Sequence, residues 1–269
     1  LKVDLARLDL EKFARTVTAI PAAQAKKGFV DAKVAVQGDP NRLETMEVRI
    51  DPLNALFGGS DLRGSMRVTD LLAPKVELRI SSNNLDVDEL MGEAAEEPAA
   101  TEPQADAAAA QDDPSLKSYG FRGSFDLKRV VVSKTELRDF KGEVSLTEGK
   151  LRLEDATFGV FGGTVSAKGT EAEIWKAKMP FRANLAVKGI EINDALTAKT
   201  RYANTLFGKT DLGIDLAGEG FETADLEKAL NGNLAMALTQ GRLARASLTQ
   251  AVVGDLGALE KVPGVKLTP

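Results

Sequence analysis

Three short motifs contain the residue types that most often carry chemistry, and none of them is complete. Gly208-Lys209-Thr210 has the ending of a phosphate-binding loop, but the glycine required five residues earlier is Ala203. Asp86 and Asp88 have the spacing of calcium ligands, but the glycine and the distal glutamate of a calcium loop are missing. Gly218-Glu219-Gly220 is too short for a dinucleotide-binding fingerprint. We interpret the three as a turn into a strand, a helix cap and a strand end.

The composition excludes further classes of chemistry. The 269 residues include no cysteine and no histidine. Thiol nucleophiles, triads that need an imidazole, and metal sites built from cysteine or histidine are therefore excluded. We find no other group of residues suited to acid–base catalysis. We expect that the protein is not an enzyme, has no catalytic residues, and uses no metal and no cofactor.

The charges are concentrated in one segment. Apolar residues make up 43% of the chain and charged residues 28%, which is typical of a folded protein. Residues 93–115 are rich in alanine, proline and acidic residues, and we interpret them as a disordered linker. Without this segment the chain is close to neutral, so it shows no footprint of nucleic-acid binding.

Apolar and polar residues alternate through most of the remaining sequence, which predicts β-strands with one buried face. Leu151–Gly169 is the clearest example, and we expect two strands that reverse at Gly162-Gly163. The predicted helices are few and short: residues 9–13, 194–207, 223–230 and 248–259. The sequence predicts a mainly β fold, an elongated and curved antiparallel sheet built from repeated strand units.

Two stretches occur twice. Phe57-Gly58-Gly59-Ser60 reappears 104 residues later as Phe161-Gly162-Gly163-Thr164, and the strand-and-helix pattern of residues 77–90 reappears at 182–196. Because the units match in order as well as in character, they indicate a repeat architecture. We expect a first β module at 1–92, the linker at 93–115, and a second β module at 116–269 that ends in a helical segment.

The short helices are too few to cover a sheet of this size, so its apolar face needs another partner. Two sheets packed together form a closed sandwich, whereas a sheet that curls without closing leaves an apolar groove suited to acyl chains. Trp175 lies in a charged stretch, where it covers the sheet end or lies at a lipid headgroup. The candidate groove residues are Leu151, Leu153, Leu185, Val187, Leu212, Ile214, Leu216, Leu234, Met236 and Leu238.

Several motifs in order resemble the C-terminal region of AsmA-family proteins. In that family a strand precedes an aromatic-Gly-Gly hairpin, and a Leu-Asn-Gly strand and a Gly-x-Leu strand follow. The matching segments are Leu137–Gly142, Gly149–Leu151, Phe161–Thr164, Leu185–Ile190, Gly218–Gly220, Leu230–Leu234 and Gly241–Leu243. The resemblance covers about residues 119–259, and residues 43–90 through the internal repeat.

The resemblance implies a periplasmic protein anchored to the inner membrane, with an incompletely closed apolar groove. It implies phospholipid as the partner and a role in lipid transport between the membranes and in outer-membrane integrity. Since the chain opens on Leu1 and has no apolar run long enough to span a membrane, we interpret it as a fragment that lacks the anchor. The alternative is a scaffold with sealed apolar faces that binds outer-membrane or other envelope proteins.

Overall fold

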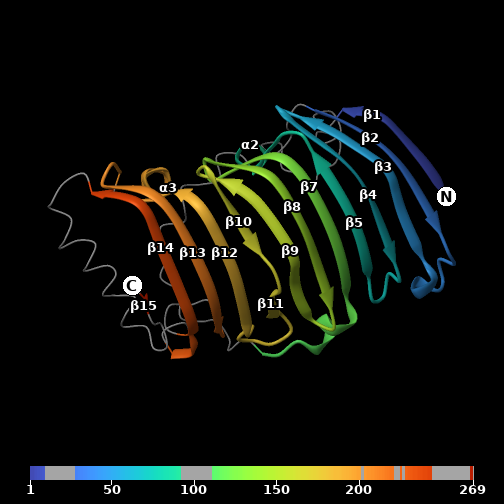
Figure 1. Cartoon of the computed structure of the whole chain (residues 1–269). Helices are drawn as coiled ribbons and strands as arrows, with labels where there is room; N and C mark the ends of the chain where they lie inside the picture. The colour runs from blue at the N-terminus through green and yellow to red at the C-terminus, as the bar shows by residue number, and fades with distance from the viewer. Residues whose placement is uncertain are drawn as a thin grey trace, which may run out of the picture. The chain divides into compact units, whose positions relative to one another are not determined.

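The computed structural model describes residues 1–9, 28–91, 111–200, 203–220, 225, 228–243 and 267–268. These residues are mainly β, with short helices only, so the predicted fold class is confirmed (Figure 1). The chain forms two compact units: residues 1–111 with 115–149, and residues 112–114 with 150–269. The contacts group residues 115–149 with the first unit, whereas the sequence analysis assigned residues 116–269 to one module.

Unit 1 contains one sheet with the strand order β1-β2-β3-β4-β5-β7-β8, and β6 pairs with β7. In the described part of this unit β1 and β8 do not pair, so the sheet is open. Its elements are β1 (Lys2–Asp9), β2 (Gly28–Gln37), η2 (Leu43–Thr45), β3 (Glu47–Phe57), β4 (Ser60–Thr69), β5 (Lys75–Ser82), β6 (Leu85–Asp86), α2 (Val87–Met91), η3 (Pro114–Ser118), β7 (Gly120–Val132) and β8 (Thr135–Thr147).

Unit 2 contains strands in the order β9-β10-β12-β13-β14-β15, and β11 pairs with both β9 and β12. Its elements are β9 (Lys150–Val160), β10 (Gly163–Ala167), β11 (Thr170–Glu173), β12 (Phe181–Glu191), α3 (Ile192–Lys199), β13 (Leu206–Gly218), β14 (Asn231–Leu243) and β15 (Leu267–Thr268). The strands of each unit are bent along their length (Figure 1).

The strand pairs are antiparallel with three exceptions among the described strands. β5 and β6 run parallel to β7, and β14 runs parallel to β15. A parallel pair needs a long connection that returns the chain to the starting end of the strand. The connection from β5 to β7 contains β6, α2 and η3, so it is long enough for this return.

Bulges keep the apolar residues of a strand on one face of the sheet. Leu5 and Leu8 are three residues apart, an odd spacing that would place them on opposite faces of a regular strand. They nevertheless pair with Ala32 and Val30 of β2, which lie two residues apart on one face. The extra residue is accommodated at Arg7, whose φ of 48° lies in the left-handed region. The register also shifts between Ile50 and Leu53 and between Val187 and Ile190.

The predicted repeat appears as the same order of elements. β3, β4 and β5 pair in succession before α2, and β9, β10 and β12 pair in succession before α3. The next strands differ, because β7 is parallel to β5 whereas β13 is antiparallel to β12. The two hairpin turns are also offset by one residue. Gly58-Gly59 forms the first turn, whereas Phe161-Gly162 forms the second and Gly163 begins β10, so the predicted reversal at Gly162-Gly163 was wrong by one residue.

The fold requires glycine at position 163 because of a close backbone approach rather than a turn. A Cβ at this position would lie 2.5 Å from the Ile190 nitrogen and 2.5 Å from the Lys188 oxygen, both in the bulge of β12. We expect Gly163→Ala to lower the free energy of unfolding by about 2 kcal/mol or more, measured by urea denaturation. Gly213→Ala is the matched control, since the nearest atom to its Cβ would be the Ala235 Cβ at 3.9 Å. Equal effects of the two substitutions would contradict this reading.

The helix predicted at residues 194–207 is shorter in the structure. It is α3, which ends at Lys199, where the amide and hydroxyl of Thr200 both donate to the Leu196 carbonyl. β13 then begins at Leu206. Residues 10–13 and 248–259 of the predicted helices, most of the helix predicted at 223–230, and the linker up to residue 110 lie outside the described residues. Asp9, predicted as the start of a helix, is the last residue of β1, and Pro114 and Ser115 at the end of the predicted linker belong to η3.

Candidate functional site

The acidic pair suspected of calcium binding has a structural role. The Asp86 Oδ1 accepts a hydrogen bond of 2.8 Å from the Glu89 amide, which caps the first turn of α2. The carboxylate of Asp88 accepts bonds of 2.6 and 2.7 Å from the amides of Ser133 and Lys134 in the β7–β8 turn. The predicted capping role is therefore confirmed for Asp86, whereas Asp88 lies within α2 and binds the β7–β8 turn instead. Within the described ranges, no three acidic side chains are grouped as a metal site.

The two glycine motifs also belong to strands. Gly208-Lys209-Thr210 lies within β13, so its interpretation as a turn before the strand was wrong. Lys209 and Thr210 pair with β12 and β14. The Lys209 Nζ is 3.9 Å from Glu191, and only 1% of the Thr210 side chain is exposed. This geometry does not form a phosphate-binding loop. Gly218 is the last residue of β13, so the interpretation of Gly218-Glu219-Gly220 as a strand end is confirmed.

The registers place all ten candidate groove residues on one face of the unit 2 sheet. Residues directly opposite each other in paired strands point to the same face. Val187 pairs with Leu212, which pairs with Met236, and Leu185 pairs with Ile214, which pairs with Leu234. The remaining pairs that connect the set are Ala183 with Leu216, Thr210 with Leu238, Ala172 with both Phe181 and Leu151, and Thr170 with Leu153.

This face is only partly covered. Val187 is buried, with 8% of its side chain exposed, whereas Leu151, Met236 and Leu238 are 37%, 45% and 36% exposed. The other six candidates are half-buried. A sealed core would hide such side chains almost completely, so the exposure indicates an apolar face that is open to solvent over part of its area.

Unit 1 has a corresponding face that the sequence analysis did not include among its candidates. One row of paired residues crosses seven strands: Val3, Val34, Ile50, Met66, Leu78, Gly123 and Val144. The same alternation that identified the unit 2 residues runs through these strands, so the signal was present in the sequence. We call these two surfaces, one in each unit, the apolar faces.

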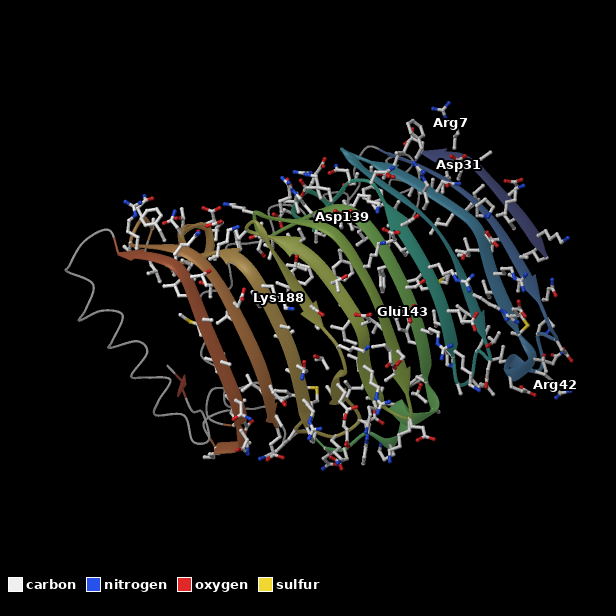
Figure 2. All side chains as sticks on the ribbon, in the orientation of Figure 1. Arg7, Asp31, Arg42, Asp139, Glu143 and Lys188 are labelled. Carbon is white, nitrogen blue, oxygen red and sulfur yellow. The ribbon has the colours of Figure 1, made fainter. Side chains whose placement is uncertain are left out.

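The opposite face of each sheet is charged, and Figure 2 labels Asp31, Glu143 and Lys188 among its side chains. In unit 1, Glu47 accepts hydrogen bonds of 3.0 to 3.1 Å from Arg67 and Arg49. The bonds from Arg67 and then Arg49 hold the pKa of Glu47 below its ordinary value of 4.5.

A second carboxylate, near the hairpin end of β7 and β8, is held in the same way. Hydrogen bonds from Arg138 and then Arg129 lower the pKa of Glu136. On the charged faces, ion pairs join Glu47 to Arg67 and Arg49 in unit 1 and Glu171 to Arg152 in unit 2. These faces therefore have the character of hydrated outer surfaces.

Trp175 lies in the connection between β11 and β12. The Lys176 Nζ lies 5.3 Å from the centre of the Trp175 ring. The Trp175 carbonyl accepts a 2.7 Å hydrogen bond from the Asp113 amide. The Asp112 carboxylate accepts a 3.0 Å bond from the Ala177 amide, so two residues near the end of the segment predicted as a disordered linker are attached to this connection. These contacts favour a local structural role for the tryptophan.

Comparison with known families agrees with the resemblance seen in the sequence. Residues 10–269 match the AsmA family. The chain belongs to the AsmA family. No curated protein and no solved structure matches it. Among the described residues, no helix of this AsmA-family chain has the length and apolar character needed to cross a membrane.

Proposed function

We propose that this AsmA-family chain binds phospholipid through its apolar faces. The single observation that carries the proposal is the partial exposure of a continuous set of leucine, isoleucine, valine and methionine side chains on unit 2. Each acyl methylene that leaves water for such a surface contributes about 0.8 kcal/mol. A chain of a dozen methylenes therefore gains several kilocalories per mole without any directional contact.

Each sheet has an apolar face and a charged face, so it can separate an acyl chain from a polar headgroup. An acyl chain on an apolar face meets no charged side chain in the rows of paired residues described above, while the polar headgroup stays in water. In this proposal the protein binds lipid and catalyses no reaction, because the binding requires only the burial of acyl chains against the apolar faces.

We further propose that the chain works in the periplasm, attached to the inner membrane by an anchor in the parent protein. There it supports phospholipid movement between the inner and outer membranes, and with it outer-membrane integrity. Membership of the AsmA family supports this placement. The competing role is a scaffold that binds outer-membrane or other envelope proteins.

Native mass spectrometry of the purified chain, with lipid extraction from the same sample, tests the proposal. We expect phospholipid to be retained at one or more molecules per chain and to be released by organic solvent. A protein that carries no lipid, and that takes up none when phospholipid is supplied in detergent, would support the scaffold instead.

A further inference from the structure

Three connections lie side by side at one end of the unit 1 sheet: residues 38–46, 70–74 and 115–119. The Leu71 amide donates to the Leu43 carbonyl at 3.0 Å, and the Asp70 amide donates to the Met46 carbonyl at 3.1 Å. The Gly120 amide donates to the Pro74 carbonyl at 2.9 Å, which attaches the third connection. We call this continuous group of loops the loop edge.

The loop edge exposes large apolar side chains. Leu72 is 63% exposed, Leu43 is 43% exposed, and Tyr119 is 38% exposed. These residues lie on loops at a strand end, so they are separate from the apolar faces that underlie the proposed function. Exposed side chains of this size on neighbouring loops indicate a contact surface.

Hydrogen bonds hold the turn that carries Leu72 in place. The Asp70 Oδ1 accepts hydrogen bonds from the amides of Leu72 and Ala73 at 3.2 and 3.1 Å. These bonds form a tight turn at residues 70–73.

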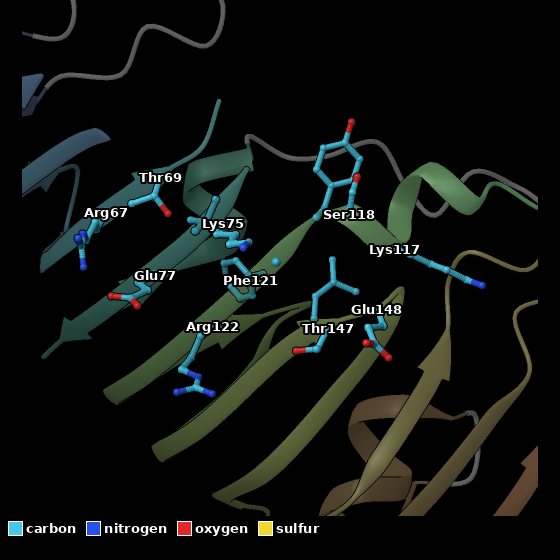
Figure 3. A pocket seen from close by; sticks show the side chains of 14 residues that line it. Arg67, Thr69, Lys75, Glu77, Lys117, Ser118, Phe121, Arg122, Thr147 and Glu148 are labelled. Atoms are coloured by element: carbon cyan, nitrogen blue, oxygen red, sulfur yellow. The ribbon is translucent and has the colours of Figure 1, made fainter. Parts of the chain in front are cut away.

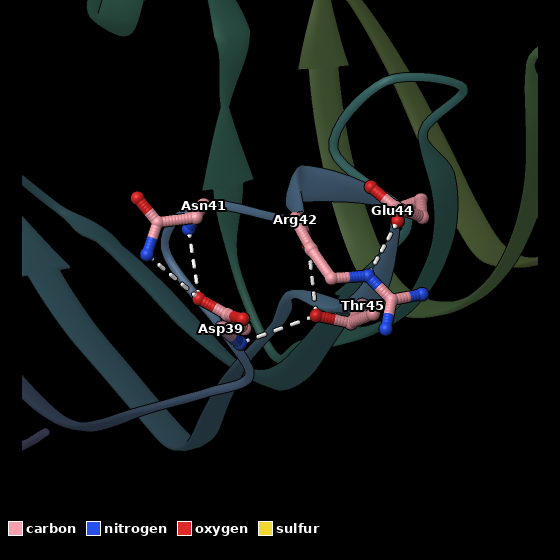
Figure 4. Close-up of polar contacts among 5 residues, drawn as sticks. All are labelled: Asp39, Asn41, Arg42, Glu44 and Thr45. Atoms are coloured by element: carbon pink, nitrogen blue, oxygen red, sulfur yellow. Dashed lines mark hydrogen bonds and ion pairs between the residues drawn. The ribbon is translucent and has the colours of Figure 1, made fainter.

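The loop that carries Leu43 is held by its own polar contacts. Asp39 accepts from the Asn41 amide at 2.9 Å, and the Thr45 hydroxyl donates to the Arg42 carbonyl at 2.7 Å (Figure 4). The leucines are therefore presented by ordered turns and lose little further conformational entropy on contact.

The opposite end of the same sheet has turns held by polar groups, and its exposed apolar residues, Phe29 and Leu56, pair within β2 and β3 rather than lying on loops. Asp61 accepts from the amides of Asn83 and Asn84 at 3.0 and 2.9 Å, and Asp88 covers the β7–β8 turn as described above. The two ends of the strands therefore differ in chemistry. Only the loop edge combines neighbouring exposed leucines with an exposed tyrosine in the described part of unit 1.

A cavity of about 480 Å³ borders the loop edge, and cationic side chains line it (Figure 3). Lys75, Lys117 and Arg122 contribute to its wall together with Tyr119, as do the carboxylates of Glu77 and Glu148. Arg67 also lines the cavity, but both of its hydrogen bonds go to Glu47. Within the residues that the structure describes, neither Lys75 nor Arg122 is within ion-pair distance of a carboxylate. The wall therefore carries more positive than negative side chains, and this excess of positive charge is available to an anionic group.

We propose that the loop edge docks on the surface of a phospholipid bilayer. Leu72 and Leu43 enter the region between headgroups and acyl chains, Tyr119 lies at headgroup level, and Lys75 and Arg122 face the phosphates. A protein partner would need a socket shaped for each projecting side chain, whereas a fluid bilayer accepts projecting loops of any spacing. This docking does not depend on lipid binding at the apolar faces.

Co-sedimentation with lipid vesicles tests the proposal. The purified chain is mixed with vesicles of phosphatidylcholine, with and without phosphatidylglycerol, and the bound fraction is measured. We expect the paired substitution Leu43→Ser and Leu72→Ser to lower the partition coefficient by about tenfold or more. Both side chains are exposed, so the variant is expected to keep the thermal unfolding midpoint of the parent chain.

Leu56→Ser is the matched control, because Leu56 is 59% exposed but lies within β3 rather than on the loop edge. It is expected to leave vesicle binding unchanged, and Lys75→Glu is expected to weaken binding more when phosphatidylglycerol is present. A parent chain that does not sediment with vesicles, or an equal loss in Leu56→Ser, would overturn the proposal. The loop-edge variant is expected to retain copurified lipid, which separates this outcome from a failure of the proposed function.

Discussion

Replacing Ile214 with aspartate is expected to leave unit 2 folded and to reduce phospholipid binding about tenfold or more. Ile214 lies in β13 between Leu185 of β12 and Leu234 of β14, its direct partners across the apolar face. It is half-buried, so a carboxylate at this position remains hydrated from the open side of the face. The same carboxylate would place a charge beside the acyl chain, and removing that charge from water is costly.

The measurement combines a folding assay with lipid retention. Circular dichroism and urea unfolding are expected to show a loss of about 1 to 2 kcal/mol in the free energy of unfolding. Native mass spectrometry reports bound phospholipid. Ala235→Asp is the matched control, since Ala235 is exposed on the next strand and pairs with Gly213 on the charged face. If Ile214→Asp unfolds the unit while Ala235→Asp does not, the face is a sealed core and the lipid-binding proposal fails.

Much of the secondary structure follows from alternation in the sequence. A strand with one wet face places apolar residues at every second position, and this local pattern is visible without any partner strand. For that reason the ten candidate residues of unit 2 could be selected correctly as members of one face. The family could also be recognised, because the order of glycine-containing turns is a property of the sequence alone.

The bulges could not be predicted as easily, although each one changes the spacing of apolar residues in the sequence. Leu5 and Leu8, Ile50 and Leu53, and Val187 and Ile190 are each three residues apart, which interrupts simple alternation. In isolation this spacing is equally compatible with a strand end or with a helical turn. Only the register of the neighbouring strand shows that both members of such a pair return to the same face.

Long-range pairing was the other feature that the sequence did not reveal. β7 lies parallel to β5 because the intervening chain returns to the same end of the sheet, and no local pattern encodes that return. The grouping of residues 115–149 with unit 1 has the same origin. The loop edge was missed for a related reason: Leu43, Leu72 and Tyr119 are far apart in sequence, and hydrogen bonds between loops bring their segments together.

The bulges also affect how continuous the apolar face is. At Arg7, where the strand changes register, the guanidinium lies 5.1 Å from the centre of the Phe29 ring, and Phe29 alternates with Val30 of the apolar face. The charge of the inserted residue is therefore directed to the charged side of the sheet. A strand can in this way bend and still present an unbroken apolar surface.

A fluorescent label at position 236 is expected to report lipid on the apolar face of unit 2. The chain contains no cysteine, so Met236→Cys provides a single attachment site for a polarity-sensitive dye. Met236 is 45% exposed and pairs with Leu212, whereas its neighbour Ala237 is exposed on the opposite face and pairs with Asp211. A short-chain phosphatidylcholine below its critical micelle concentration is expected to shift the emission to shorter wavelength at 236, because the dye loses water on contact with acyl chains.

Ala237→Cys carrying the same dye is the control, and its emission is expected to stay unchanged. The two positions are adjacent in β14, so they share the same strand stability and differ only in the face that they occupy. Keeping the lipid monomeric removes any contribution from bilayer docking at the loop edge. A shift of equal size at both positions would contradict face-specific binding, and a shift at 237 alone would place the lipid on the charged side of the sheet.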